Sequence, residues 1–260
     1  MITSASNQQM KHVIQLNKKA KTRYEQRVFV VEGIKMCMEA PKEDIQAMYV
    51  SETFLQTAEH VEALQGYSYE VVADNVFRTI SDTQTPQGIL ALVKMPEYTM
   101  EDLMGKNGKS PHLLILECIQ DPGNLGTMIR TGEGAGVTGI LMNKTTVDVF
   151  HPKTIRATMG SLYRVPFYVT DSLEETLSEL KKQGVSLYAA HLKGTKSYDQ
   201  PDYMNPCGFL IGNEGNGLTE EIAQCADEYI RIPMEGKVES LNAAIAATLL
   251  MYEVNRQRKK

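Results

Sequence analysis

The chain has 260 residues, of which 42% are hydrophobic and 23% charged, and its formal net charge is −5. This length supports one large or two smaller domains with packed cores, and the composition excludes a disordered or collagen-like chain. The longest apolar runs are well short of the ~20 residues of a membrane span, and the start of the chain lacks a secretory apolar core, so we expect a cytoplasmic protein without a membrane partner. Four widely spaced cysteines without a CxxC pair argue against a metal site and a disulfide framework.

Positive charge is concentrated at the two ends of the chain. Residues 1–27 hold six basic residues against Glu25 alone, a local balance of 6 − 1 = +5. The six are Lys11, Lys18, Lys19, Lys21, Arg23 and Arg27, and the chain ends in Arg256, Arg258, Lys259 and Lys260. A local basic face attracts phosphates whatever the total charge, because attraction is screened beyond roughly 8 to 10 Å. Such runs are also typical of solvated helix faces, so both interpretations stay open.

The first hundred residues alternate strand and helix. Residues 8–22 have apolar positions at helical spacing with lysines between them, which predicts an amphipathic basic helix. Apolar runs predict strands at 28–33, 48–52, 69–73 and 88–93, with helical stretches near 34–40, 53–65 and 74–80. This pattern predicts a small α/β domain.

The polar segment 94–112 contains two prolines and two glycines and indicates a domain connection. We therefore predict domains at 1–98 and 113–260, joined by a linker at 99–112. Strands are predicted at 113–119, 139–142, 167–170, 186–192 and 208–212, with helices near 124–135, 152–160, 172–183, 219–225 and 240–256. Apolar strands that alternate with helices favour a mostly parallel sheet, with ligands at the carboxyl ends of its strands.

Two glycine-rich segments in the second domain are candidates for a ligand site. In DPGNLGTMIRTGEGAG (121–136), Asn124 can cap the following helix and Arg130 falls about one and a half turns into it. In IGNEGNGL (211–218), three glycines around Glu214 suit a tight loop with open backbone amides, although this loop is neither a Walker A motif nor GxGxxG. Each segment also has an ordinary structural reading, as a capped helix or a tight turn.

A third segment, IRIPMEGKVESLNAAIA (230–246), is a short strand and a turn that lead into an apolar helix. Ser240 is a suitable N-cap for that helix. Asn242 is a second polar residue within its first turn and needs another partner, which favours a ligand contact.

In order and spacing, these segments resemble the three motifs of the SpoU (TrmH) family of RNA ribose methyltransferases in the SPOUT superfamily. NLGTMIR matches the first motif, GNEGNGL the second and IPMEGKVESLNAAIA the third. The stretches TPQGILA (85–91) and RATMGSLYRVPF (156–167) are similar as well. The resemblance covers essentially the whole second domain, while the first domain looks like the ribosomal-protein-like RNA-binding domain of many members.

The resemblance implies S-adenosylmethionine as cofactor, RNA as partner, no metal, and a homodimer with the last helix at its interface. It also implies a deep trefoil knot, whereas the pattern alone predicts an unknotted doubly wound sheet. The cofactor-binding residues it implies are Gly212, Ile232, Met234, Leu241 and Asn242. The catalytic residue it implies is Arg130, with Asn124, Glu214, Ser240 and Asn242 in supporting positions.

The implied reaction is displacement of the sulfonium methyl by a ribose 2′-hydroxyl, which needs an aligned oxygen and removal of its proton. A guanidinium has a pKa above about 12, so Arg130 is expected to hold the adjacent phosphate and stabilise the developing alkoxide. The proton would leave through Glu214, water or the phosphate. This chain has SLNAA where members often have SLNVS, so Ala244 replaces a common hydroxyl, which puts a hydroxyl relay there in doubt.

Three classes of function remain in view. The leading expectation is 2′-O-methylation of structured RNA, with ribosomal RNA favoured over transfer RNA because a separate recognition domain is present. A catalytically degenerate RNA-binding or ribosome-assembly factor is the second class, and loss of cofactor binding or of methyl transfer would distinguish it. A nicotinamide-dependent oxidoreductase is disfavoured, because no GxGxxG follows an early strand with an acidic residue about 20 positions later.

Overall fold

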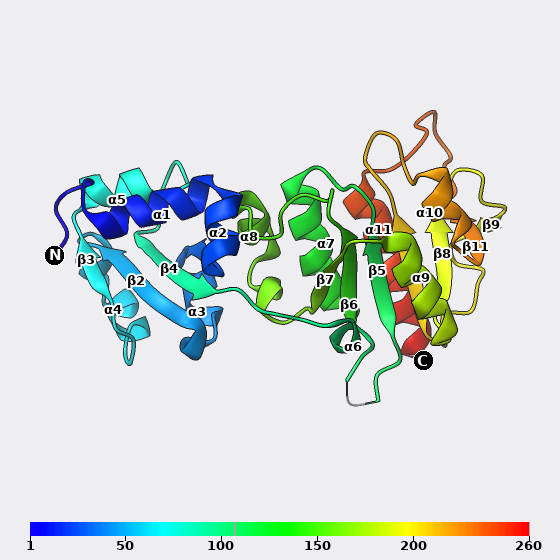
Figure 1. The fold of residues 1–260 in the computed structure, drawn as a ribbon, viewed down its shortest axis with the longest axis horizontal. Coiled ribbons are helices and arrows are strands. Elements are labelled where there is room, and N and C mark those ends of the chain that lie inside the picture. The colour runs from blue at the N-terminus through cyan, green and yellow to red at the C-terminus, as the bar shows by residue number, and fades with distance from the viewer. Residues whose placement is uncertain (107, 260) are drawn as a thin grey trace. The chain divides into compact units, whose positions relative to one another are not determined.

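The computed structural model describes residues 1–106 and 108–259, and these form two compact units (Figure 1). Unit 1 comprises Met1–Pro96 and Asp148–Tyr163, and unit 2 comprises Glu97–Val147 and the chain from Arg164 onward. None of the described helices combines the length and apolar character that a bilayer-spanning segment requires.

Unit 1 is built on a four-stranded sheet with the strand order β1-β4-β2-β3. Its strands are β1 (Val28–Glu32), β2 (Ile45–Ser51), β3 (Glu70–Val72) and β4 (Ile89–Lys94), which confirms the four predicted strands. Strand β4 lies antiparallel between β1 and β2, and β2 pairs with β3 in parallel.

Helices cover both faces of this sheet (Figure 1). They are α1 (Gln8–Lys18), α2 (Ala20–Gln26), α3 (Ile34–Glu39), α4 (Ala58–Ala63), α5 (Asp74–Ile80) and α8 (Pro152–Thr158), with 3-10 turns η1 (Lys42–Asp44) and η2 (Phe54–Gln56). The apolar sides of α1 and α5 share one core, in which Met10, Val13 and Leu16 pack with Val76 and Phe77. Helix α3 lies across the sheet from them.

The predicted helix over 8–22 is wrong in one respect, because the chain breaks at Lys19 into two helices. Lys19 has extended backbone angles, φ −123° and ψ 108°. The Arg23 guanidinium donates to the carbonyls of Leu16 (2.7 Å) and Asn17 (3.3 Å), which lie in the last turn of α1. These carbonyls lose their helical donors where the helix ends, and the buried Arg23 side chain replaces them.

Unit 2 contains a seven-stranded sheet in which every neighbouring pair is parallel, with the order β7-β6-β5-β10-β8-β11-β9. Its strands are β5 (His112–Leu116), β6 (Gly139–Asn143), β7 (Phe167–Thr170), β8 (Ser186–Ala190), β9 (Lys196–Ser197), β10 (Cys207–Ile211) and β11 (Glu228–Arg231). The predicted parallel α/β architecture is confirmed. The two-residue strand β9 was not predicted, since it is too short to have a periodicity.

Two layers of helices sandwich the central strands of unit 2. The helices are α6 (Met100–Leu103), α7 (Pro122–Ala135), α9 (Leu173–Lys182), α10 (Glu220–Gln224) and α11 (Ala243–Arg258), with a 3-10 turn η3 (Ser161–Tyr163) in unit 1. Helices α6, α9 and α10 share one core with β5, β8 and β10. Helices α7 and α11 pack against each other, and α11 also contacts β5 and β10. The buried side chains of these two helices include Leu125, Met128 and Ile129 of α7 and Ala247, Leu250 and Met251 of α11.

The segment proposed as a linker contributes to the core of unit 2. Helix α6 falls within 99–112, and its Leu103 is fully buried. A Cβ added to Gly139 on β6 would lie 2.3 Å from Leu103 Cγ, so this helix sits directly on the strand. A four-residue helix is too short to be recognised from apolar periodicity.

Candidate functional site

Three segments that are distant in sequence meet at one edge of the unit 2 sheet. They follow β5, β10 and β11, and the carboxyl ends of parallel strands lie at the same edge. The loops after β10 and β11 enclose a cavity of about 300 Å³. Its lining includes Ile211, Gly212, Asn213, Glu214, Gly217, Leu218, Arg231, Ile232, Met234, Glu239, Ser240, Leu241 and Leu250.

Asn213 stabilises the tight turn of the glycine-rich loop after β10. The sequence analysis did not single out this residue. Asn213 and Gly217 exchange backbone hydrogen bonds of 3.0 and 2.9 Å, and Asn213 Oδ1 accepts from the backbone N–H groups of Gly215 and Asn216. A Cβ on Gly212 would lie 2.1 Å from the Gly217 carbonyl carbon, so only glycine fits there. Asn213 directly follows Gly212 in a loop with two further glycines, and this turn signal could have been noticed.

Glu214 ties this loop to the start of helix α7. Its carboxylate accepts from the backbone N–H groups of Gln120 and Asp121 (both 3.1 Å) and from Asn124 Nδ2 (3.0 Å). Burial raises the pKa of Glu214, but the hydrogen bonds from Asn124, Gln120 and Asp121 outweigh burial and hold the pKa below its ordinary value. Glu214 is therefore an ionised acceptor that positions the first two motifs.

The prediction that Asn124 caps its helix is wrong. Helix α7 begins at Pro122, and Asp121 is its N-cap, with its side chain accepting from Asn124 N–H at 2.8 Å. Proline is well suited to the first helical position because it has no N–H to satisfy there. Asn124 lies inside the first turn, which leaves its side-chain amide available for a bridging role.

Capping of helix α11 also differs from expectation, because Asn242 and not Ser240 is the N-cap. Asn242 Oδ1 accepts from the backbone N–H groups of Ala244 (2.9 Å) and Ile245 (3.3 Å). Its Nδ2 donates to Asn124 Oδ1 at 3.0 Å. The side chains of Asn242, Asn124 and Glu214 thus form one hydrogen-bonded chain that connects all three motifs.

Arg130 lies just over two turns into α7, on the exposed side of the helix. It does not line the cavity, and within the described part of the chain it makes no hydrogen bond or ion pair. Its helix packs along α11, where a Cβ on Gly134 would approach the Tyr252 hydroxyl to 3.0 Å. The guanidinium is therefore available to a group that approaches from outside this subunit's cavity.

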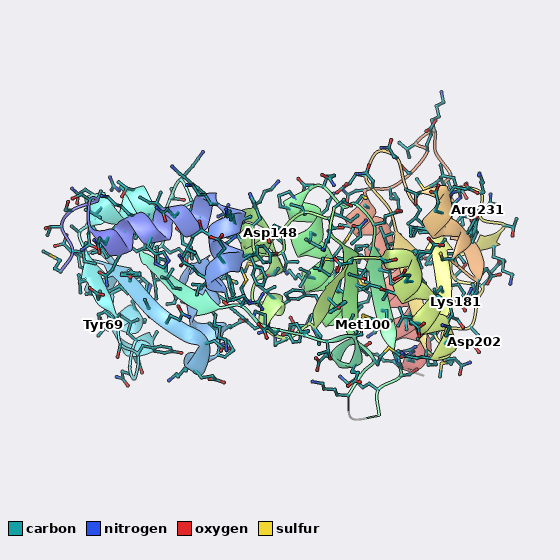
Figure 2. The ribbon with its side chains drawn as sticks, viewed as in Figure 1. Tyr69, Met100, Asp148, Lys181, Asp202 and Arg231 are labelled. Carbon is teal, nitrogen blue, oxygen red and sulfur yellow. The ribbon has the colours of Figure 1, made fainter. Side chains whose placement is uncertain are left out.

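The cavity brings together most of the predicted cofactor-binding residues. Gly212, Ile232, Met234 and Leu241 line it, as do Glu214 and Ser240, whereas Asn242, Asn124 and Arg130 do not. The sequence analysis did not assign Arg231, at the end of β11 (Figure 2), or Glu239 to the site, and both line the cavity. These two also line an adjoining hollow of about 270 Å³ with Leu192 and Pro233.

The chemistry of this cavity suits a nucleoside. Leucine and isoleucine side chains form apolar walls, and a loop with three glycines brings backbone amide and carbonyl groups to the rim. A cavity of about 300 Å³ is at the lower end of the roughly 300 to 1,000 Å³ typical of small-molecule sites. Arg231 and Glu239 add one charge of each sign.

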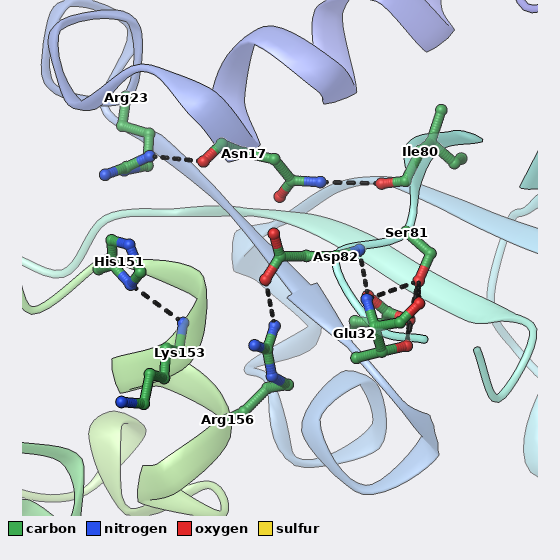
Figure 3. Close-up of polar contacts among 10 residues, drawn as sticks. Asn17, Arg23, Glu32, Ile80, Ser81, Asp82, His151, Lys153 and Arg156 are labelled. Carbon is green, nitrogen blue, oxygen red and sulfur yellow. Dashed lines mark hydrogen bonds and ion pairs between the residues drawn. The ribbon is translucent and has the colours of Figure 1, made fainter. Parts of the chain in front are cut away.

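The predicted RNA-binding residues of unit 1 fall into two groups. Lys11, Lys18, Lys19 and Lys21 are exposed, and Arg27 is half-buried at the C-cap of α2 in the left-handed conformation (φ 58°). The prediction for Arg23 is wrong, because its side chain is 3% exposed and forms an ion pair with Asp148. Figure 3 shows its contact with Asn17 at the end of α1. Both terminal nitrogens of this buried guanidinium are engaged within the protein, so Arg23 has a structural role and is not a contact for RNA.

The basic C-terminus is also less free than its composition suggests. Arg258 donates to the carbonyls of Tyr203, Ser110, Pro111 and Asn205 at 2.7 to 3.0 Å. Arg256 pairs with Glu253 on the same helix. Lys259 is exposed, and Lys260 lies outside the described residues.

Comparisons with known proteins agree with this geometry. A family model described as the SpoU rRNA Methylase family matches residues 111–252, and one described as the MRM3-like substrate binding domain matches residues 7–91. The chain is 32% identical over 255 residues to 23S rRNA (guanosine(2553)-2'-O)-methyltransferase RlmP of Bacillus subtilis (strain 168), covering 97% of this chain and 98% of that protein.

Solved structures of similar chains share this fold. An AdoMet-bound rRNA methyltransferase from Sinorhizobium meliloti superposes with a TM-score of 0.84 at 31% identity, covering 98% of this chain and 97% of that one. The SpoU methyltransferase AviRb from Streptomyces viridochromogenes, in complex with AdoMet, superposes with a TM-score of 0.87 over 98% and 99% of the two chains. The two sequences are 24% identical, so this superposition supports the fold alone.

Proposed function

The chain belongs to the SpoU rRNA methylase family, and from that premise we propose that it methylates a ribose 2′-hydroxyl of ribosomal RNA with S-adenosylmethionine as methyl donor. The observation that carries the proposal is the meeting of three motifs around one apolar cavity in unit 2. A relative of nearly equal length is named for 2′-O-methylation of 23S rRNA, which makes large-subunit RNA the first substrate to test. Such a substrate implies that the protein acts in the cytoplasm.

S-adenosylmethionine supplies an electrophilic methyl group on a sulfonium sulfur. Ile232, Leu241 and Leu250 would provide apolar walls for its adenosine part, and the backbone around Gly212 would provide polar groups for its edges. Arg231 and Glu239 at the rim are complementary to the carboxylate and ammonium of an amino-acid end. The residues present therefore fit this cofactor.

Arg130 is proposed as the catalytic residue. A guanidinium offers five N–H donors in a planar fork, which suits bidentate contact with the phosphate next to the target ribose. Held in this way, it fixes the nucleotide and stabilises negative charge that develops on the 2′-oxygen. Its exposure and its lack of partners within the described residues leave the fork free to act.

Glu214 is not proposed as the acceptor of the 2′-hydroxyl proton. Its carboxylate already accepts three hydrogen bonds, and its lowered pKa makes it a weak base. Water or the substrate phosphate is the better acceptor. Glu214, Asn124 and Asn242 act instead as positioning residues that hold the cavity loops against α7.

We further propose that the active site is completed by a second copy of the chain. Arg130 does not line the cavity of its own subunit. On the neighbouring helix α11, Ile245 and Tyr252 are 50% and 46% exposed, and with the half-buried Leu249 they form an apolar stripe at helical spacing. A homodimer through α7 and α11 would cover this stripe and bring Arg130 to the partner's cavity.

The deep trefoil knot of the family is likewise proposed for unit 2. The tight closure of the loop at Gly212 and Gly217, and the insertion of β10 between β5 and β8, are compatible with a threaded chain. An experimental structure traced from β10 to α11 would test it, and an unthreaded path would contradict it.

The experiment for the proposed function is transfer of labelled methyl from S-adenosylmethionine to total RNA from cells that lack this protein. The RNA is fractionated by size. Label in the large ribosomal species is the expected result, and label in small RNA would make the protein a transfer-RNA enzyme. Cofactor binding without label in any RNA would favour a binding or assembly factor.

Substitution of Arg130 tests its assigned role. Arg130→Lys keeps the positive charge but removes bidentate geometry, so we expect loss of most turnover with unchanged S-adenosylmethionine affinity. Methyl transfer and calorimetric cofactor binding are measured on the same preparation. Parallel loss of both would overturn the assignment.

A further inference from the structure

Charge is segregated within unit 1, although its total is balanced. The stretch from Glu39 to Asp74 contains eight carboxylates, counting these two residues, and Lys42 is its single lysine or arginine. This stretch includes β3 and α4, which lie at one end of the unit, while α2 and α8 lie at the other (Figure 1). A polyanion would be repelled from the first end and attracted to the second.

The segment Asp148–Tyr163 is firmly part of unit 1, although the methyltransferase family model extends through it. The Arg23 guanidinium binds the Asp148 carboxylate, and the Tyr24 hydroxyl donates to Asp148 at 2.8 Å. The Phe150 ring packs at 6.0 Å from that of Tyr24 and at 4.9 Å from that of Phe29. Both the ion pair and the ring contacts join the segment to α2 and β1.

This anchoring presents the polar side chains of α8 next to α2 (Figure 3). His151 and Lys153 are exposed, and Arg156 reaches the Asp82 carboxylate at 2.6 Å. The backbone N–H of Lys153 donates to His151 Nδ1 at 3.2 Å, which leaves Nε2 of the ring as an outward donor.

The basic residues of α1 and α2 extend the same surface. Lys18 and Lys19 are exposed and have no carboxylate partner among residues 1–106 and 108–259. Lys21 makes only a long, exposed ion pair with Glu25 at 3.7 Å. Arg23 and Tyr24 on the following turn bind Asp148, four residues before α8, so the segment that leads into α8 is packed against α2.

We propose that α8 is part of the RNA-binding surface of unit 1, with Lys153 contacting the sugar–phosphate backbone together with Lys18 and Lys19. This inference rests on the proposed function for the identity of the partner as RNA. It makes the surface composite, since a segment between two parts of the methyltransferase unit joins the N-terminal recognition domain. The chain enters unit 2 on both sides of this segment, so an RNA held there is tethered to the catalytic unit.

Structured RNA suits this surface better than an acidic protein does. Exposed lysines spaced over two elements match a regular array of phosphates, and the outward His151 donor suits a phosphate oxygen or a 2′-hydroxyl. Contacts to phosphate give affinity with a characteristic dependence on salt. The salt dependence of binding is therefore the diagnostic observable.

The test compares Lys153→Ala, Lys18→Ala and a matched control, Lys42→Ala, in the full-length protein. Binding to an unmodified in vitro transcript of 23S ribosomal RNA is measured by filter binding at several KCl concentrations. Each lost phosphate contact should weaken binding about 5- to 8-fold at 0.1 M salt and reduce the slope of log K against log salt by about 0.7 to 0.9. Lys42→Ala, in the acidic stretch, should leave both unchanged.

The outcomes separate this inference from the proposed function. Weaker binding by Lys153→Ala, with unchanged cofactor affinity and melting temperature, supports it. Binding by Lys153→Ala equal to that of Lys42→Ala, while the wild-type protein binds and methylates RNA, would overturn the role of α8 and leave the enzyme intact. Absence of RNA binding and methylation by the wild-type protein would instead contradict the proposed function itself.

Discussion

At the scale of single residues, several polar side chains that the sequence suggested as catalytic or RNA-binding groups have a structural role instead. Glu214 lies in a glycine-rich loop next to a cavity, yet its carboxylate is occupied by donors from α7. Arg23 belongs to a basic run, yet it is buried against Asp148. In both cases the hydrogen-bond partners decide the role, and they come from distant parts of the sequence.

Glu214→Gln should lower the methylation rate without changing its pH profile. Because its pKa is held below the ordinary value, Glu214 is ionised throughout an assay range of about pH 6 to 9 and does not titrate there. The amide replaces one acceptor oxygen by a donor, so the loop loses part of its attachment to α7. Rates measured across that range should give the wild-type shape; loss of an acidic limb in the variant would identify Glu214 as the base.

His112 should make unit 2 sensitive to mild acid. It is 1% exposed, and burial, followed by the nearby Arg258 charge, lowers its pKa to about 3. In the unfolded chain His112 binds a proton as the pH falls through about 6.5, whereas in the folded chain it stays neutral until about pH 3. The contribution of neutral His112 to the free energy of unfolding is therefore complete above about pH 6.5 and is lost as the pH falls toward 3. From pH 7 to 5 the loss should be about 2 kcal/mol. Urea unfolding of His112→Phe at both pH values should lack this component; an equal loss in the variant would exclude His112 as its source.

At the scale of elements, the last helix is fixed at both ends by side-chain hydrogen bonds. Asn242 caps its start, and Arg258 near its end donates to carbonyl groups of the loops before β5 and β10. Between these ends, Ala247, Leu250 and Met251 are fully buried. The helix thereby carries the Asn242 contact to a defined position beside Asn124.

Arg258→Ala should destabilise unit 2 by about 3 kcal/mol, since it leaves four carbonyl groups without their charged donor. Lys259→Ala is the matched control, because Lys259 is exposed one residue away and should change stability by less than about 0.5 kcal/mol. Urea denaturation followed by circular dichroism compares the two. Similar stabilities of the two variants would show that the Arg258 contacts contribute little.

At the scale of the whole molecule, we propose that unit 1 recognises RNA and that unit 2 carries out methyl transfer. We also propose that two copies of the chain associate to form a complete active site. Unit 1 carries the segregated charge, and unit 2 carries the cavity. All three motifs lie in unit 2, yet Arg130 does not line the cavity of its own subunit. The proposed dimer would account for this, because the partner's Arg130 would complete the active site.

Mixing two inactive variants tests whether Arg130 acts across subunits. The Arg130→Ala variant lacks the guanidinium but retains an intact cavity. The Gly212→Val variant retains Arg130 but should have a distorted cavity loop, because the valine side chain would clash with the Gly217 backbone. If the site is shared, a heterodimer has one complete site and the mixture should regain roughly a quarter of wild-type methylation, since about half of randomly paired dimers are mixed. The absence of any recovery after verified subunit exchange would place Arg130 and its cavity in the same subunit.

The sequence alone was sufficient for the alternation of strands and helices, the parallel sheet and the three motifs. Apolar periodicity and glycine position are local properties, and the family resemblance rests on local runs such as GNEGNGL and SLN. The family resemblance implied Gly212, Ile232, Met234 and Leu241 as residues of one site, and all four line the same cavity.

Only the tertiary structure decided what each polar side chain binds. Asn242 became the N-cap of α11 and Asp121 the N-cap of α7 because each helix begins two or three residues away from its predicted start. The Arg23 side chain donates to two carbonyls at the end of α1, where the chain breaks. The membership of Asp148–Tyr163 in unit 1 was equally hidden, since the ion pair and ring contacts that place it there join residues more than a hundred positions apart. Long-range packing has no periodic signature in a sequence, and that is why these features required the fold.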